Sequence, residues 1–243
     1  MKILFFCINS DHLTVSQILK ATNLISENLS INLDQFELIL KPAKYNVNFN
    51  LDRLEIFKRR IYKIITLKIV KSIYVRIKFK ILLKKNQQKN FLKTHVVSSA
   101  NSEDTYKIIR DSKEKLVIFV NYDEIIKEDI LSICEPLNVH YGFLPEFRGI
   151  SPLVWQIKKQ KQIAAITIHR MTSGIDDGDI IAEVPFSIET KKNESDAEMA
   201  IYKNDILANA LYLGVRRLLK FDLSFGIPQN TFKGDTNYYG RQK

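Results

Sequence analysis

Asn138 and His140 are the residues of this sequence whose types and spacing best suit chemistry on a bound molecule. They lie two positions apart, so in an extended backbone both side chains point to one side and Val139 points to the other. Thirty-six residues after His140, a Gly-Ile-Asp-Asp-Gly-Asp turn at 174–179 brings in Asp176. An amide, a histidine and an aspartate are the groups that acyl transfer to an amine requires.

Each of the three side chains fits one step of such a transfer. His140, with an unperturbed pKa of about 6.5, can be neutral at pH 7 and accept the amine proton. Asn138 can donate its side-chain N–H to the developing oxyanion, a contact worth roughly 3–4 kcal/mol. Asp176 can orient His140 and stabilise its charged form, or hold a water that relays the proton. We therefore predict Asn138, His140 and Asp176 as the catalytic residues.

The other histidines and acidic residues of this region receive plainer interpretations. His12, His95 and His169 lack such neighbours and are predicted to be structural, although His169 lies just before the acidic turn and can support the site indirectly. Asp177 and Asp179 suit turn formation. The spacing of the aspartates does not fit a calcium-binding EF-hand loop, so no metal site is expected.

Apolar runs and amphipathic stretches follow one another along the chain and predict its strands and helices. Continuous apolar runs such as Ile3–Ile8 and Leu116–Val120 are typical of strands buried on both faces of a parallel sheet. Strands are also expected at Leu33–Leu40, Thr94–Val97, Leu137–His140, Ala164–Arg170 and Ile180–Ile188, and helices at Leu13–Asn28, Asn101–Ser112, Ile125–Cys134, after Ser151-Pro152 and at Asp196–Leu219. Ser151 and Ser195 are the expected caps of the last two helices, with Pro152 at the first helical position of the earlier one. This order predicts an α/β fold with a Rossmann-like, mostly parallel sheet flanked by helices. No Gly-x-Gly-x-x-Gly follows the first strand, so a nicotinamide or flavin site is not expected.

The positive charge of the chain is concentrated in one segment. The net charge is +10, yet residues 53–94 hold fourteen Lys and Arg against one acid, Glu55, which leaves 10 − 13 = −3 for the rest. We predict a basic insertion at about 44–93, in which positions 55–73 suggest a helix and the alternation at 75–81 has the period of a strand. Three interpretations of the charge at 53–94 stay open: a solvated face, contact with an anionic membrane surface, or a patch for nucleic acid or a nucleotide-linked substrate.

The residues around the two motifs resemble a known family. The pattern Asn-x-His-x-x-x-Leu-Pro-x-(Tyr/Phe)-Arg-Gly-x-x-Pro-x-x-Trp, followed by Ile-Asp-x-Gly-Asp-Ile, is similar to that of folate-dependent formyltransferases. The matching positions are Asn138, His140, Leu144-Pro145, Phe147-Arg148-Gly149, Pro152, Trp155 and Ile175–Ile180. The similarity runs from about Thr94 to about Ile188. It implies the same catalytic trio and 10-formyltetrahydrofolate as formyl donor. Some members of this family also carry a basic helical insertion before the third strand, which favours a helix at 44–93.

The resemblance also implies where ligands bind. The pteridine of the donor is expected in an apolar slot made by Val120, Asn121, Tyr122, Ile125, Ile175 and Asp177. This chain has Asn121-Tyr122-Asp123 where the family more often has a small residue, tyrosine and glycine. We predict Tyr141, Arg148 and Tyr238 as substrate contacts, because Arg148 can grip an anion and some sugar N-formyltransferases end in a similar aromatic stretch.

The predicted function is transfer of a formyl group from 10-formyltetrahydrofolate to the primary amine of an amino sugar, nucleotide-linked and destined for a surface polysaccharide. One alternative is a methionyl-tRNA formyltransferase-like activity, which the basic segment would suit. The family's tRNA enzymes carry a further C-terminal barrel, and about two dozen residues follow Leu219, so nucleic acid is not the expected partner. The other alternative is a non-catalytic binding protein on the same fold.

The expected organisation is a catalytic domain at 1–190, containing the basic insertion, followed by a C-terminal helix and short tail at 191–243. No uncharged apolar run approaches membrane-spanning length, and Cys7 and Cys134 each lie in an apolar run, which favours reduced thiols. These features predict a cytoplasmic protein. The oligomeric state, a homodimer included, and the identities of the amine and the nucleotide stay open.

Overall fold

The computed structural model describes residues 1–8, 12–41, 92–112, 115–189, 191, 193–232 and 236–240. The predicted basic insertion at 44–93 lies outside the described residues, apart from Leu92 and Lys93. Within the described part of the chain, no helix combines the length and the apolar content needed to cross a membrane. Among the described residues, Cys7 is buried, Cys134 is half-buried, and neither forms a disulfide.

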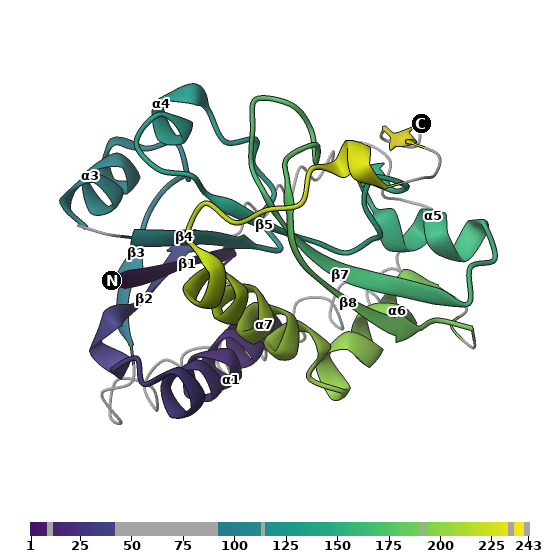
Figure 1. Cartoon of the computed structure of the whole chain (residues 1–243), viewed down its shortest axis with the longest axis horizontal. Coiled ribbons are helices and arrows are strands. Elements are labelled where there is room, and N and C mark those ends of the chain that lie inside the picture. Colours follow the sequence, from purple (N-terminus) through teal and green to yellow (C-terminus); the bar gives the residue numbers. More distant parts are fainter. Residues whose placement is uncertain are drawn as a thin grey trace, which may run out of the picture.

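A seven-stranded sheet forms the centre of the molecule (Figure 1). Its strands are β1 (Lys2–Ile8), β2 (Phe36–Lys41), β3 (Lys93–Val96), β4 (Lys115–Val120), β5 (Leu137–His140), β7 (Ile163–Arg170) and β8 (Ile180–Ser187). They are arranged in the order β3-β2-β1-β4-β5-β7-β8. The first five are parallel, whereas β7 runs antiparallel to both β5 and β8. The prediction of a mostly parallel α/β sheet is confirmed.

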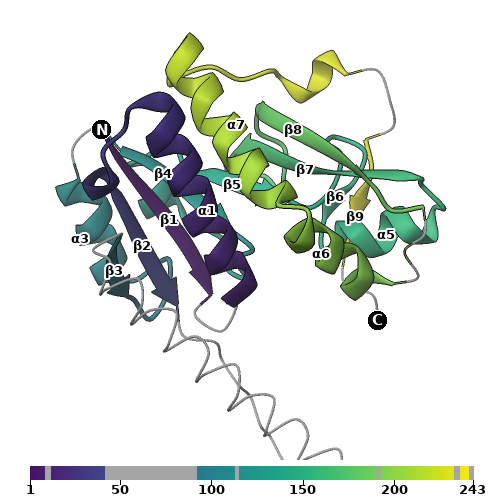
Figure 2. The ribbon, with the colours of Figure 1, turned by 90° about the horizontal axis from the view of Figure 1, so that it is seen from below.

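Helices cover both faces of this sheet (Figures 1 and 2). They are α1 (His12–Leu29), α3 (Glu103–Asp111), α4 (Glu128–Leu131), α5 (Pro152–Lys158), α6 (Glu194–Lys203) and α7 (Ile206–Phe221), with 3₁₀ turns η1 (Leu33–Gln35) and η3 (Gln229–Thr231). Helices α1 and α7 lie side by side on one face, and α3 and α4 lie on the other. Alternate residues of β1 show why: Ile3 and Phe5 join the core under α1 and α7, whereas Leu4 and Phe6 join the second core.

Two predicted helices differ from the observed ones. The helix expected at Ile125–Cys134 is reduced to the single turn of α4, because Asn101 holds the preceding segment in an extended form. Its Nδ2 donates to the Ile125 carbonyl at 3.0 Å, and its Oδ1 accepts from the Lys127 amide at 2.8 Å. The single helix expected at Asp196–Leu219 is broken into α6 and α7. Asp205 sits at the break in a left-handed conformation, with φ of 54°.

The caps at two helix starts also differ from prediction. Asn193, and not Ser195, caps α6, since its Oδ1 accepts from the Asp196 amide at 3.0 Å. Ser151 precedes α5 in a left-handed conformation and makes no side-chain cap, although Pro152 occupies the first helical position as expected. Neither difference moves a strand of the sheet.

The sheet brings the two motifs together at its carboxyl edge, next to the point where it changes direction. Strand β5 ends at His140, and antiparallel pairing sets Asn138 opposite His169 and His140 opposite Thr167. Val139 is buried in the core between them, so Asn138 and His140 share the other side of the strand as predicted. A separate two-stranded pair, β6 (Arg148–Gly149) with β9 (Tyr238–Tyr239), lies beside α5 (Figure 2).

The close packing of α7 on β7 yields a stability prediction. A Cβ atom at Gly214 of α7 would lie 2.8 Å from Cδ1 of Ile168, so a side chain at this position would have to displace the Ile168 side chain. Gly214→Leu should destabilise the protein by about 1–3 kcal/mol in urea unfolding, because overpacking forces the helix away from the sheet. Asn209→Leu, at an exposed position of the same helix, is the matched control. Equal stability of the two variants would contradict this packing.

Candidate active site

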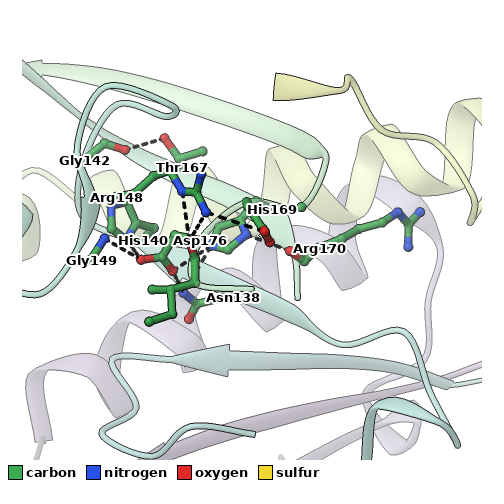
Figure 3. A network of polar contacts seen from close by, with 12 residues as sticks. Asn138, His140, Gly142, Arg148, Gly149, Thr167, His169, Arg170 and Asp176 are labelled. Atoms are coloured by element: carbon green, nitrogen blue, oxygen red, sulfur yellow. Dashed lines mark hydrogen bonds and ion pairs between the residues drawn. The ribbon is translucent and has the colours of Figure 1, made fainter. Parts of the chain in front are cut away.

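Asp176 is the centre of a polar network that joins the two predicted motifs (Figure 3). The Gly149 amide donates to its Oδ2 at 2.8 Å, and Asn138 Nδ2 donates to its Oδ1 at 3.3 Å. His140 Nδ1 lies 3.6 Å from Oδ2, and His169 Nε2 lies 3.4 Å from Oδ1. The three predicted catalytic residues therefore come together, and His169 joins them.

The turn that carries Asp176 is fixed by contacts to its backbone. Asp176 itself adopts a left-handed conformation, with φ of 50°, which aspartate tolerates better than most residues. Gln229 Nε2 donates to the carbonyls of Asp176 and Gly178, each at 2.8 Å. The guanidinium of Arg148 donates to the Ile175 carbonyl at 2.6 and 2.9 Å. These contacts hold the carboxylate over the end of β5.

Backbone carbonyls define which histidine nitrogens carry protons. His140 Nε2 lies 2.6 Å from the Phe147 carbonyl, which can only accept, so Nε2 donates and Nδ1 keeps its lone pair in the neutral ring. His169 Nδ1 lies 2.7 Å from the Arg170 carbonyl and donates in the same way. The free Nε2 of His169 then accepts from Asn138 Nδ2 at 3.2 Å. His140 Nδ1 is thus the nitrogen left to act as a base.

Burial and charge act on these groups in opposite directions. Burial lowers the pKa of His140, and the nearby Asp176 carboxylate and the Phe147 carbonyl only partly offset this. Burial raises the pKa of Asp176, but the neighbouring side chains of His169 and His140 and the Gly149 amide outweigh that and bring it to about 2. At neutral pH, His140 is a neutral base facing a fixed negative charge.

The amide of Asn138 is fully engaged in this ligand-free arrangement. Its nitrogen contacts His169 Nε2 and Asp176 Oδ1, and an amide nitrogen has two hydrogens to donate. An oxyanion would therefore have to take one of these hydrogens from its present acceptor. The two contacts, at 3.2 and 3.3 Å, are long enough to be exchanged for a shorter one to a charged oxygen.

A cavity of about 580 Å³ opens beside the network. Of the residues predicted from the sequence, those lining it are Asn121, Tyr122, Ile125, Asn138, His140, Tyr141, Ile175, Asp176 and Tyr238. Much of its wall is apolar and open to solvent, since Ile125 is 81% exposed and Tyr238 is 56% exposed. Glu194 and Glu198 of α6 form part of another wall. The volume falls within the usual range for a small-molecule site.

Three predicted ligand contacts lie outside the cavity lining. Val120 is completely buried at the end of β4. Asp177 accepts a hydrogen bond from Thr172, and its Oδ2 lies 3.5 Å from Arg148 Nη2. The Arg148 guanidinium is occupied with the 175–177 turn, so in this structure it supports the site wall. Their predicted roles toward donor and substrate stay predictions.

Residues 70–209 match the protein family described as Formyl transferase, which is more than half of the chain. The chain belongs to the formyl transferase family. A methionyl-tRNA formyltransferase from Campylobacter hominis is 33% identical over 84 residues, which make up 35% of this chain and 28% of that enzyme. A GDP-perosamine N-formyltransferase from Brucella melitensis is 26% identical over 147 residues, 60% of this chain and 54% of that enzyme. The chain thus spans about half or less of these curated relatives.

One solved structure has the same fold as this chain over nearly the whole length of this chain. The sugar 3N-formyl transferase WlaRD, crystallised in the presence of dTDP and 5-N-formyl-THF, superposes with a TM-score of 0.60. The superposition covers 99% of this chain and 70% of that one, at 18% identity. At this identity the likeness is one of fold.

Sequence reasoning missed several residues that hold the site of this formyl transferase family member. His169, predicted to be structural with a supporting role left open, contacts both Asn138 and Asp176. Gln229 fixes the turn from 53 positions away, and Gly149 is the amide that donates to Asp176. The position of His169, one residue before the end of an expected strand and just ahead of the acidic turn, was a usable signal. No such signal in the sequence pointed to Gln229.

These contacts predict how His140 titrates. In NMR titrations, the pKa of His140 should lie below its ordinary value of 6.5, because burial disfavours the charged ring. Asp176→Asn should lower that pKa further, since it removes the carboxylate that favours the imidazolium. Asp179→Asn, in the same turn, is the matched control and should leave the pKa of His140 unchanged. A rise in the Asp176→Asn variant would contradict the assigned geometry.

Proposed function

We propose that this protein transfers a formyl group from 10-formyltetrahydrofolate to the primary amine of a nucleotide-linked amino sugar, a precursor of a surface polysaccharide. One observation carries the proposal. In a member of the formyl transferase family, Asn138, His140 and Asp176 meet within 3.6 Å beside a single cavity of about 580 Å³. Asn138 supplies the hydrogen-bond donor for the oxyanion, His140 the base and Asp176 the carboxylate that the chemistry requires.

The residues of the chain divide the work of the transfer. His140 Nδ1 accepts a proton from the acceptor amine, and the imidazolium that results faces the carboxylate of Asp176. Asn138 turns one amide hydrogen toward the oxygen that becomes negative as the amine adds to the formyl carbon. The proton held by His140 then passes to the departing nitrogen. Asp176 stays ionised throughout, because its pKa is about 2.

The exposed apolar wall of the cavity fits the folate. Ile125 and Ile175 line it and are 81% and 42% exposed, so covering them with a flat ring removes apolar surface from water. Tyr122 lies on the same wall. The donor supplies the formyl carbon that is transferred. The family uses this donor, and the related fold of WlaRD was solved in the presence of a formylated folate.

Two carboxylates beside the cavity suit the polar groups of a sugar acceptor. Glu194 and Glu198 line the cavity from α6, and carboxylates accept hydrogen bonds from hydroxyl groups and from an ammonium. Tyr141 and Tyr238 add aromatic surface on which a base or sugar ring can pack. The similarity to a GDP-perosamine N-formyltransferase over 147 residues supports the same choice.

The deciding experiment is a folate-release assay with purified protein and 10-formyltetrahydrofolate. The acceptors are a panel of nucleotide-linked 3-amino and 4-amino sugars, with methionyl-tRNA as a separate arm. We expect turnover with one sugar nucleotide and none with methionyl-tRNA. Turnover with methionyl-tRNA alone would reject the amino sugar as acceptor, and no turnover in any arm would reject the proposed activity.

Substitution of the catalytic groups should lower the rate without unfolding the protein. We expect His140→Ala to lower kcat by about 10²–10⁴-fold, since it removes the general base. Asn138→Ala should lower kcat by about 10²–10³-fold, because it removes an oxyanion donor. Asn209→Leu, on the exposed face of α7, serves as the control. Wild-type kcat in His140→Ala would exclude it as the base.

The pH dependence follows from the titration of His140. A base must be deprotonated to act, so kcat/KM should fall as pH drops through the pKa of His140 in the free enzyme. Because burial lowers that pKa, the acidic limb should lie below pH 6.5. Asp176 contributes no limb near neutrality, since its pKa is about 2. An acidic limb above pH 6.5 in the wild-type profile would contradict this assignment.

A further inference from the structure

We propose that the C-terminal strand β9 positions the catalytic groups, and that Tyr239 is the positioning residue. This inference rests on the proposed function for its kinetic readout only. Residues 238–239 lie outside the segment 70–209 that matches the family, and 62 or more positions separate them from the predicted catalytic trio. They are nevertheless joined to it by consecutive contacts.

The first link, called the clamp below, is the backbone pairing of residues 237–239 with residues 148–150. The Arg148 amide donates to the Asn237 carbonyl at 3.1 Å, and the Ile150 amide donates to the Tyr239 carbonyl at 2.9 Å. The two strands approach closely at Gly149, where a Cβ atom would lie only 2.3 Å from the Tyr239 carbonyl oxygen. Gly149 has φ of +101°, a conformation that glycine adopts readily. Gly149 is therefore the residue type that the close approach of β9 requires at this position.

The second link is an aromatic stack. The ring of Tyr239 lies between two others, with centroid distances of 4.7 Å to Trp155 and 5.6 Å to Phe147, and both pairs are stacked. Trp155 belongs to α5, and Phe147 immediately precedes β6. The stack therefore fixes the segment that begins at Phe147 against a helix. Stacked pairs of this kind contribute beyond the apolar area they bury.

The clamped segment is the one that holds the catalytic groups. The Phe147 carbonyl accepts from His140 Nε2 at 2.6 Å, and so determines which nitrogen is the base. The Arg148 side chain holds the Ile175 carbonyl, and the Gly149 amide donates to Asp176 at 2.8 Å. Three consecutive residues thus orient the histidine and the aspartate. Loss of the clamp would release all three contacts together.

The strand also connects the clamp to the cavity. Neighbouring residues of a strand point to opposite sides, and Tyr238 lines the cavity while Tyr239 joins the stack. A ligand that packs on Tyr238 would hold β9 against β6. Binding of a ligand in the cavity would therefore favour the orientation of His140 that the clamp maintains.

The test compares Tyr239→Ala with Tyr239→Phe, which keeps the stack and removes only the hydroxyl. A chain truncated after Asp235 removes residues 236–243, which include Asn237 and β9. Phe221→Ala is the control, because it removes an exposed ring at the end of α7 that stacks on Phe225. Unfolding transitions are recorded for every variant.

We expect Tyr239→Ala and the truncated chain to lower kcat on the order of 10²-fold, since small misplacements of catalytic groups have effects of this size. The acidic limb of the pH profile should move from its wild-type position, because both the Phe147 carbonyl contact that raises the pKa of His140 and the burial that lowers it would change. Tyr239→Phe and Phe221→Ala should retain wild-type kcat and pH profile. Trp155 is the only tryptophan, so its emission should shift to longer wavelength when the stack is lost.

Two readouts do not depend on turnover and separate this inference from the proposed function. If the wild type formylates no acceptor, the Trp155 emission and the pKa of His140 by NMR still test the clamp. Unchanged emission and an unchanged His140 pKa in both Tyr239→Ala and the truncated chain would overturn it. An equal loss of activity in Tyr239→Phe would also overturn it, because the stack would then not be the cause.

Discussion

The site depends on a buried carboxylate. Asp176 stays ionised to a pH of about 2 although it is largely removed from water, and a charge in that position is stable only with partners. Its partners come from different parts of the fold: Asn138 and His140 from β5, His169 from β7, and Gly149 from β6. The need to satisfy this one group therefore brings four segments to the same point.

The opposing effects of burial and charge give the histidine its chemistry. Burial alone would make His140 a weak base, and full exposure would leave it partly protonated near neutrality. Beside Asp176 it is neutral at rest, and its charged form gains a counter-ion as soon as it appears. Because the Phe147 carbonyl binds Nε2, the same surroundings also choose the reactive nitrogen. Protonation state and orientation thus have a common structural origin.

The topology of the sheet explains why this point lies beside a cavity. In open α/β sheets, ligands bind beyond the carboxyl ends of the strands, where connections to either side diverge. Here the parallel part of the sheet ends at β5, and β7 returns antiparallel to it. That reversal sets His169 opposite Asn138 and leaves the turn at 174–179 above the end of β5. Loops from the neighbouring strands form the cavity walls.

The sequence by itself determined the strands, the fold class and the pairing of Asn138 with His140. These follow from local rules: apolar runs buried on both faces, and a period of two that sets alternate residues on one side. The tertiary structure alone decided that His169 contacts both Asn138 and Asp176, that Gln229 and Tyr239 support the site, and that Asn101 shortens α4. These contacts join residues 24 to 90 positions apart, and no local period records them. They arise only when folding closes those distances, because each buried polar group must then find a partner.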